Sequence, residues 1–179
     1  VLTVEEQAEA GGFTKVITLI DCSGSTASIY KDRPVLGWIK DAALGLLAYA
    51  HLHKLPAATI AFSDNAWLLA PESTNYVAHG KAILKLQPEG WTNLAVAVRL
   101  ALNLKPKKAL IAAITDGLVE PRDMEYLAEQ SKANKVIAAI VDPNAEGKGA
   151  ILHQAGKIAL YDIRPDAAGR TIVTASEGS

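Results

Sequence analysis

The hydrophobic positions of the chain alternate between short unbroken runs and longer segments that repeat about every 3.6 residues. The unbroken runs are rich in Val, Ile and Ala, which is typical of strands buried on both faces of a sheet. They predict buried strands over residues 15–21, 57–62, 108–115, 135–141 and 158–163. A strand over 66–70 follows the Ser63-Asp64-Asn65 turn closely enough to form a hairpin, and 171–174 is a further candidate strand.

The segments with helical periodicity lie between these strands. They predict helices over residues 34–54, 79–86, 94–104 and 121–133, with a weaker helix over 149–155. Pro34 suits a first helical turn, and Thr92 or Asn93 can cap the helix that begins at Leu94. Residues 30–33 are expected to form a solvated loop.

Buried strands that alternate with helices predict parallel pairing, with helices on both faces of the sheet. The fold class is therefore α/β, and the hairpin over 57–70 adds an antiparallel strand at one edge. Open sheets of this kind bind ligands beyond the carboxyl ends of their strands. The places to look for a site are therefore the loops after Asp21, after Phe62, before Asn93, after Asp116 and after Asp142.

Composition narrows the function classes. The 179 residues are 50% hydrophobic and 21% charged, which fits one globular domain. A formal net charge of −1 argues against direct nucleic-acid binding, which needs a basic excess. The single cysteine, Cys22, excludes an internal disulfide. No apolar run approaches the roughly 20 residues that cross a bilayer, so we expect a soluble, cytoplasmic protein without a membrane partner.

Oxygen-bearing side chains gather in three of the loops. Asp21-Cys22-Ser23-Gly24-Ser25 follows the first strand, Thr92 precedes a helix, and Asp116 follows a central strand. Two carboxylates and three hydroxyls suit a hard cation such as Mg²⁺, Mn²⁺ or Ca²⁺ better than Zn²⁺. The competing interpretation is that Asp21, Ser23 and Ser25 are ordinary turn and cap residues.

Taken together, Asp21-x-Ser23-Gly24-Ser25, Thr92 and Thr115-Asp116-Gly117 resemble the metal-ion-dependent adhesion site of von Willebrand factor type A domains. The resemblance implies a Rossmann-like, doubly wound, mostly parallel six-stranded sheet with one antiparallel edge strand. It also implies that Mg²⁺ is the first-choice ion. The predicted organisation is an N-terminal lead-in over 1–14, the domain over 15–165, and a C-terminal tail over 166–179 that includes the candidate added strand.

The resemblance further implies a non-enzymatic, metal-dependent protein-interaction module, whose partner supplies a Glu or Asp to the ion. An AAA+ ATPase of the MoxR or magnesium-chelatase type is a partner class that family analogy suggests; the chain itself has no GxxxxGK[ST] motif. Two alternatives remain open. One is a Mg²⁺-dependent phosphatase or phosphotransferase with Asp21 as nucleophile, and the other is a ribonucleoprotein-associated domain of the same family.

Several other residues have two interpretations each. Trp91 either anchors a partner at the rim of the site or packs beneath its loop. Asp64 is expected to cap a turn in preference to contacting a metal. His51 and His53 are spaced so that they face different sides of a helix, and Cys22 is expected to be a buried thiol.

Overall fold

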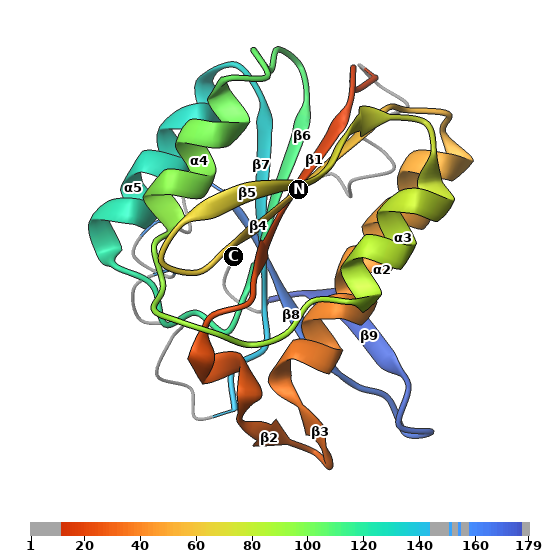
Figure 1. Cartoon of the computed structure of the whole chain (residues 1–179), viewed down its shortest axis with the longest axis vertical. Helices are drawn as coiled ribbons and strands as arrows, with labels where there is room; N and C mark the ends of the chain where they lie inside the picture. The colour runs from red at the N-terminus through yellow and green to blue at the C-terminus, as the bar shows by residue number, and fades with distance from the viewer. Residues whose placement is uncertain (1–11, 144–150, 152–153, 155–157, 177–179) are drawn as a thin grey trace.

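The computed structural model describes residues 12–143, 151, 154 and 158–176 (Figure 1). Most of the predicted helix over 149–155 and most of the lead-in over 1–14 lie outside the described residues. The elements in chain order are β1 (Val16–Asp21), the 3₁₀ turn η1 (Gly24–Ala27), β2 (Ile29–Tyr30), β3 (Arg33–Pro34), α2 (Val35–Leu52), β4 (Ala57–Phe62), β5 (Ala66–Ser73), α3 (Tyr76–Leu84), α4 (Leu94–Leu102), β6 (Leu110–Thr115), α5 (Pro121–Glu129), η2 (Gln130–Lys132), β7 (Lys135–Ile140), β8 (Ala159–Pro165) and β9 (Thr171–Ala175).

A single central sheet organises the molecule, with the strand order β5-β4-β1-β6-β7-β8-β9. The five inner strands β4, β1, β6, β7 and β8 are parallel, which confirms the doubly wound α/β prediction. The prediction of six strands with one antiparallel edge was wrong in number. The sheet has seven strands, because β9 turns back on β8 and makes the second edge antiparallel as well.

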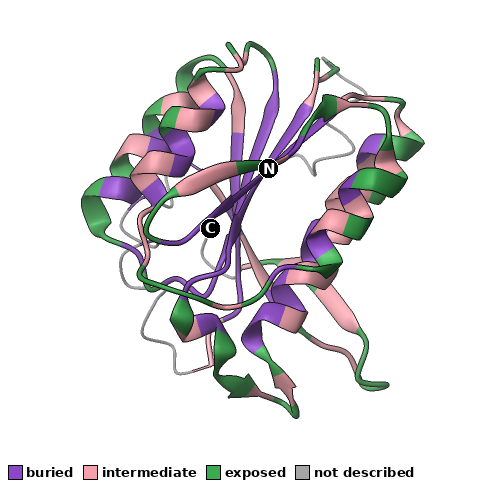
Figure 2. Cartoon of the chain, in the orientation of Figure 1, coloured by how far each residue is buried: buried purple, intermediate pink, exposed green. Residues whose placement is uncertain are grey.

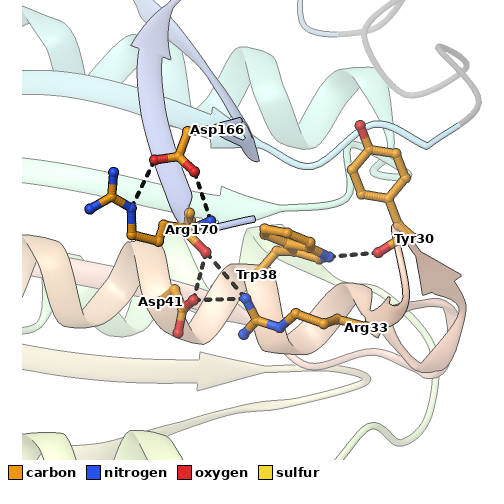
Figure 3. Close-up of polar contacts among 7 residues, drawn as sticks. Tyr30, Arg33, Trp38, Asp41, Asp166 and Arg170 are labelled. Carbon is orange, nitrogen blue, oxygen red and sulfur yellow. Dashed lines mark hydrogen bonds and ion pairs between the residues drawn. The ribbon is translucent and has the colours of Figure 1, made fainter. Parts of the chain in front are cut away.

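The turn between β8 and β9 explains the added strand. The Asp166 carboxylate accepts hydrogen bonds from the backbone N–H groups of Ala168 and Arg170, both at 2.9 Å. It also pairs with the Arg170 side chain at 3.0 Å (Figure 3). An Asp at this position stabilises a tight turn by bonding to the backbone that follows it.

The helices cover both faces of the sheet. In Figure 1, α2 and α3 lie together on one side of the strands, and α4 and α5 lie together on the other. Figure 2 shows the inner strands as the most deeply buried part of the molecule, with exposed residues on the outer sides of the helices. Every residue of β1, β4 and β6 is buried, so these three strands form a rigid centre for the loops that leave them.

One helix begins earlier than predicted because its cap precedes the predicted range, and another has a cap that was predicted. The helix expected over 79–86 begins at Tyr76, because the Asn75 side chain accepts a hydrogen bond from the Ala78 N–H at 3.2 Å. The helix predicted from Leu94 is capped in the same way by Asn93, which accepts from the Val96 N–H at 3.3 Å. None of the helices within the described residues has both the length and the apolarity needed to cross a bilayer.

The segment predicted as a solvated loop over 30–33 is a short hairpin. β2 and β3 pair antiparallel across a two-residue turn, in which Lys31 and Asp32 both have positive φ, at 48° and 68°. Positive φ at both central residues is the signature of a type I′ turn, which usually recruits Asn and Gly. Because Lys31 and Asp32 occupy these two positions, the sequence did not predict the hairpin.

Side chains anchor this hairpin to the body of the domain (Figure 3). Arg33 pairs with Asp41 of α2 at 2.9 Å, and Asp41 also accepts a hydrogen bond from the Thr171 hydroxyl of β9 at 2.6 Å. The Arg33 guanidinium stacks over the Trp38 ring, whose N–H donates to the Tyr30 carbonyl at 2.8 Å. The segment that follows Ser25 is therefore held against α2 and β9.

Candidate metal centre

The candidate site lies where the direction of strand addition reverses. From β1 the chain crosses through α2 to β4 on one side, and later places β6 on the other side of β1. In doubly wound folds, ligands bind beyond the carboxyl ends of the strands at such a point. Asp21 ends β1 and Asp116 directly follows β6, so both predicted carboxylates lie at this end of the sheet.

Asp21 is fully buried and accepts hydrogen bonds through both carboxylate oxygens. One oxygen accepts from the backbone N–H of Ser23 at 2.9 Å and from its hydroxyl at 2.6 Å. The other accepts from the Thr115 hydroxyl at 2.6 Å. The side chain is thus fixed by the loop that follows β1 and by the end of β6. Sequence reasoning missed Thr115 as a contributor, although its place directly before Asp116 was visible.

A chain of hydroxyls connects the two carboxylates. The Ser23 and Ser25 hydroxyl oxygens lie 3.1 Å apart, and the Ser25 hydroxyl donates to the Asp116 carboxylate at 2.5 Å. The other Asp116 oxygen accepts from the Leu118 N–H at 3.0 Å. Four of the five predicted ligands, Asp21, Ser23, Ser25 and Asp116, therefore form one continuous cluster.

Among the described residues, the two carboxylates of the cluster have no positive side chain as a partner: neither Asp21 nor Asp116 pairs with a Lys, Arg or His. Burial, followed by the nearby charge of Asp116, raises the pKa of Asp21 from its usual 3.8 to about 6, while hydrogen bonds from Ser23 and Thr115 act in the opposite direction. Two carboxylates crowded in this way favour a bound cation.

The loop that carries the fifth predicted ligand, Thr92, is tied to the same place. The Gly24 N–H donates to the Gly90 carbonyl at 2.8 Å, so the two loops touch through their backbones. Gly90 has a positive φ of 71°, and a side chain there would meet the Asp64 carboxylate at 2.9 Å. That carboxylate accepts the backbone N–H of Trp91. Asp64, which follows β4, thus also holds the backbone of this second loop. The turn sequence around Asp64 did not predict that role.

Thr92 and Trp91 occupy the edge of the cluster. Thr92 is half-buried, and no hydrogen bond among the described residues joins it to Asp21, Ser23, Ser25 or Asp116. Trp91 is 82% exposed, so it does not pack beneath its loop. Thr92 also lines a cavity of about 670 Å³, together with Trp91 and residues of α4 and α5.

The donor set suits a hard cation. Two carboxylates and two serine hydroxyls converge, and a third hydroxyl lies on the adjacent loop. Mg²⁺, Mn²⁺ and Ca²⁺ bind such oxygens, whereas Zn²⁺ prefers Cys and His. Across the described residues, no three His, Cys, Asp or Glu side chains form a cluster able to hold a metal. The available site chemistry is therefore that of mixed carboxylate and hydroxyl oxygens.

The other candidate residues do not join this centre. Cys22 is buried with its thiol against the Phe62 carbonyl at 3.4 Å, and burial raises the pKa of the thiol to about 12. A thiol with that pKa stays protonated at neutral pH and is a poor nucleophile. His51 stacks on Tyr76, and the His53 ring lies against Tyr49.

Comparison of the sequence with protein-family models and with curated proteins gives no match. Solved structures do match in fold. The conserved hypothetical protein BatB from Bacteroides thetaiotaomicron is 22% identical with a TM-score of 0.60, over 92% of this chain and 82% of that one. An aerotolerance-related membrane protein from Bacteroides fragilis is 17% identical, with the same TM-score and coverage. The SpRpn10 VWA domain is 13% identical with a TM-score of 0.66, over 87% of this chain and 90% of that one. The chain therefore has the fold of a von Willebrand factor type A domain.

Proposed function

We propose that this chain is a protein-interaction module that uses a divalent cation to capture an acidic residue of a partner protein. Mg²⁺ is the first choice of ion, and Asp21, Ser23, Ser25, Thr92 and Asp116 are its proposed ligands. The observation that carries the proposal is the hydroxyl chain between two carboxylates that have no positive counter-charge among the described residues.

The cluster is organised to bind without moving far. Asp21 is held from two sides by Ser23 and Thr115, and Ser25 is held by Asp116. These contacts hold the four side chains in place before any ligand arrives, which reduces the entropy lost on binding. A cation held by mostly neutral hydroxyls would supply positive charge at the surface, where a carboxylate from another protein can approach.

Thr92 has a distinct place in this proposal. It belongs to a loop that the Gly24–Gly90 and Asp64–Trp91 contacts hold beside the cluster, yet its own side chain forms no hydrogen bond with the cluster. Its hydroxyl is therefore free to turn toward the centre when a partner binds. Replacing it should weaken capture of the partner while the fold remains intact.

Partner class and cellular location extend the proposal beyond the site. The likeness to the fold of the SpRpn10 VWA domain supports an interaction role in general terms. An AAA+ ATPase of the MoxR or magnesium-chelatase type is our proposed partner class, and the cytoplasm is the proposed location; both rest on the family resemblance.

A non-enzymatic role is part of the same proposal. A phosphatase that used Asp21 as nucleophile would need a carboxylate oxygen open to substrate. Asp21 is instead fully buried, and both its oxygens accept hydrogen bonds. Hydrolysis of a generic phosphate ester by the purified protein in Mg²⁺, abolished in Asp21→Asn, would overturn this part.

The proposal is tested by capture from the source cell's lysate under three conditions: wild type in Mg²⁺, wild type in EDTA, and Thr92→Ala in Mg²⁺. Bound proteins are quantified by mass spectrometry. We expect a partner that is recovered with wild type in Mg²⁺ and lost or much reduced in the other two samples. Equal recovery in all three samples would contradict metal-dependent capture.

A further inference from the structure

Thr92, the proposed fifth ligand, lines a cavity of about 670 Å³. Its walls come from the loop before α4, from α4 itself, and from the start of α5. These helices pack against each other on one face of the sheet (Figure 1). A volume of this size accommodates several side-chain groups of a bound segment. Whatever binds at the centre therefore has room to continue along these helices.

Two arginines in the cavity wall keep their charge available. Arg99 of α4 and Arg122 of α5 are both exposed, and neither forms an ion pair or side-chain hydrogen bond with any other described residue. An arginine whose five N–H groups have no protein partner can bind a carboxylate in a bidentate manner. The cavity therefore has two side chains in its wall that are able to bind an anion.

Three acidic residues also line the cavity, and two of them accept hydrogen bonds from backbone N–H groups. Asp64 accepts the backbone N–H of Trp91, and Asp123 is buried, with its carboxylate 3.3 Å from the Ala95 N–H. Both carboxylates accept hydrogen bonds from backbone N–H groups near the start of α4. Glu120 is exposed and forms no hydrogen bond with Arg99 or Arg122.

Trp91 supplies an apolar surface at the same cavity. Its side chain is 82% exposed, and it lies in sequence beside the half-buried Thr92, with its backbone N–H held by the exposed Asp64. Exposed tryptophans of this kind are frequent anchors in protein interfaces. A partner segment that crosses from the centre into the cavity would pass beside it.

We infer that the cavity binds a second acidic side chain of the partner, so that the module recognises an extended segment with two carboxylates. One carboxylate goes to the candidate metal centre, and the other pairs with Arg99 and Arg122. The inference rests on the proposed function for the first carboxylate and adds the specificity of the second. The occupant is a segment of a partner protein, because the anion-binding arginines adjoin the proposed carboxylate site through Thr92.

Synthetic peptides in a Gly/Ser background provide the test. One peptide has a single central Glu, and the others add a second Glu at each position from one to five residues before or after it. Binding to the wild-type protein is measured by calorimetry in saturating Mg²⁺. Because exposed ion pairs contribute modestly, we expect the best two-Glu peptide to bind about fivefold more tightly than the single-Glu peptide.

The double variant Arg99→Gln/Arg122→Gln separates this pairing from general charge. Both side chains are exposed, so the variant should fold normally. It should bind the single-Glu peptide as wild type does and lose the preference for two Glu residues. Arg164→Gln removes an exposed positive charge outside the cavity wall and should keep the preference.

The outcomes distinguish the two proposals. If wild type binds the single-Glu peptide in Mg²⁺ but no second Glu improves affinity, or if the preference survives in the double variant, the inference is overturned and the proposed function stands. If a two-Glu peptide binds equally in EDTA and depends on the arginines, the cavity assignment stands and the metal dependence fails. If no peptide binds in either condition, both are overturned.

Discussion

Two polar clusters lie deep in this domain, and they differ in charge. At the carboxyl end of the sheet, Asp21 and Asp116 are joined by serine hydroxyls. Between β4, β5 and α3, the buried His79 ring is bracketed by two hydroxyls, at 2.7 Å from the Thr59 oxygen and 3.1 Å from the Ser73 oxygen. Both clusters place polar atoms where burial is costly unless they are paired.

The His79 cluster is complete with neutral partners. Each ring nitrogen has a hydroxyl partner, and burial lowers the pKa of His79, which favours the uncharged ring. The Asp21 cluster has its hydrogen bonds but two carboxylates and no counter-charge among the described residues. A satisfied neutral cluster stabilises the fold, whereas a satisfied cluster with excess charge points to a ligand.

The largest effect should come from the neutral cluster. His79→Ala leaves a cavity and removes the partner of the buried Thr59 hydroxyl, so we expect a loss of about 3 kcal/mol in the free energy of unfolding. Urea denaturation of the metal-free protein measures it. His79→Gln keeps polar groups in place and should cost less. A loss below about 1 kcal/mol in His79→Ala would show that the cluster is not a structural element.

A slightly smaller effect should come from the charged cluster, and only when a cation is present. A divalent ion at a hundredfold excess over its Kd should add about 2.7 kcal/mol to the free energy of unfolding of wild type. Asp116→Asn keeps the shape of the side chain and removes one charge. It should abolish this gain and leave the metal-free protein as stable as wild type, or more so.

Thermal melts of both proteins in Mg²⁺ and in EDTA provide this measurement. His79→Gln is the matched control, since it alters a buried polar residue away from the candidate centre and should keep the full metal-induced shift. An Asp116→Asn protein with the wild-type shift would remove Asp116 from the ligand set.

A further effect of about 1 kcal/mol is expected at the hairpin anchor. Arg33→Ala removes a half-exposed ion pair with Asp41 and a stacking contact on Trp38. The variant should unfold at lower urea concentration and still show the metal-induced shift, because no hydrogen bond or ion pair among the described residues joins Arg33 to Asp21 or Asp116. Arg164→Ala, an exposed arginine outside this network, should be neutral. Equal stability of the two variants would mean that the anchor contributes nothing.

The smallest effect is a pH dependence that belongs to His79. Burial lowers its pKa below the usual 6.5, so the folded state binds a proton less readily than the unfolded state. The contribution of the neutral His79 ring to the free energy of unfolding is complete above pH 6.5 and is lost as the pH falls below that value. The raised pKa of Asp21 has the opposite effect. It increases the free energy of unfolding as the pH falls from about 6 to 3.8.

The difference between wild type and His79→Gln isolates the histidine from Asp21. In EDTA, the stability difference between the two proteins should shrink as the pH falls from 7.5 toward 5. A difference that is constant across this range would contradict a buried, neutral His79.

The sequence was sufficient for the fold wherever the hydrophobic pattern was strong. The runs that became β1, β4, β6 and β7 were unbroken and β-branched, and each is a buried parallel strand in the structure. β9 was visible as a candidate strand but not as a full member of the sheet. Its pairing depends on the Asp166 turn and on Thr171, which bonds to Asp41 far away in sequence.

The candidate site was predictable as a set of residues and less so as a geometry. The positions of Asp21, Ser23, Ser25 and Asp116 after β1 and β6 predicted that these side chains lie together. In the structure, hydrogen bonds join all four. The sequence did not predict what holds the Thr92 loop in place, because the Asp64 carboxylate that accepts the Trp91 N–H comes from a different loop. The free arginines of the adjoining cavity come from two helices whose packing no local pattern specifies.

Calorimetric titration of Mn²⁺ into the metal-stripped protein tests most directly whether the charged cluster is a metal centre. The structure predicts a single saturable site in wild type, no detectable binding in Asp116→Asn, and wild-type binding in His79→Gln. Absence of binding in wild type, or equal binding in wild type and Asp116→Asn, would contradict the assignment of Asp21, Ser23, Ser25 and Asp116 as ligands.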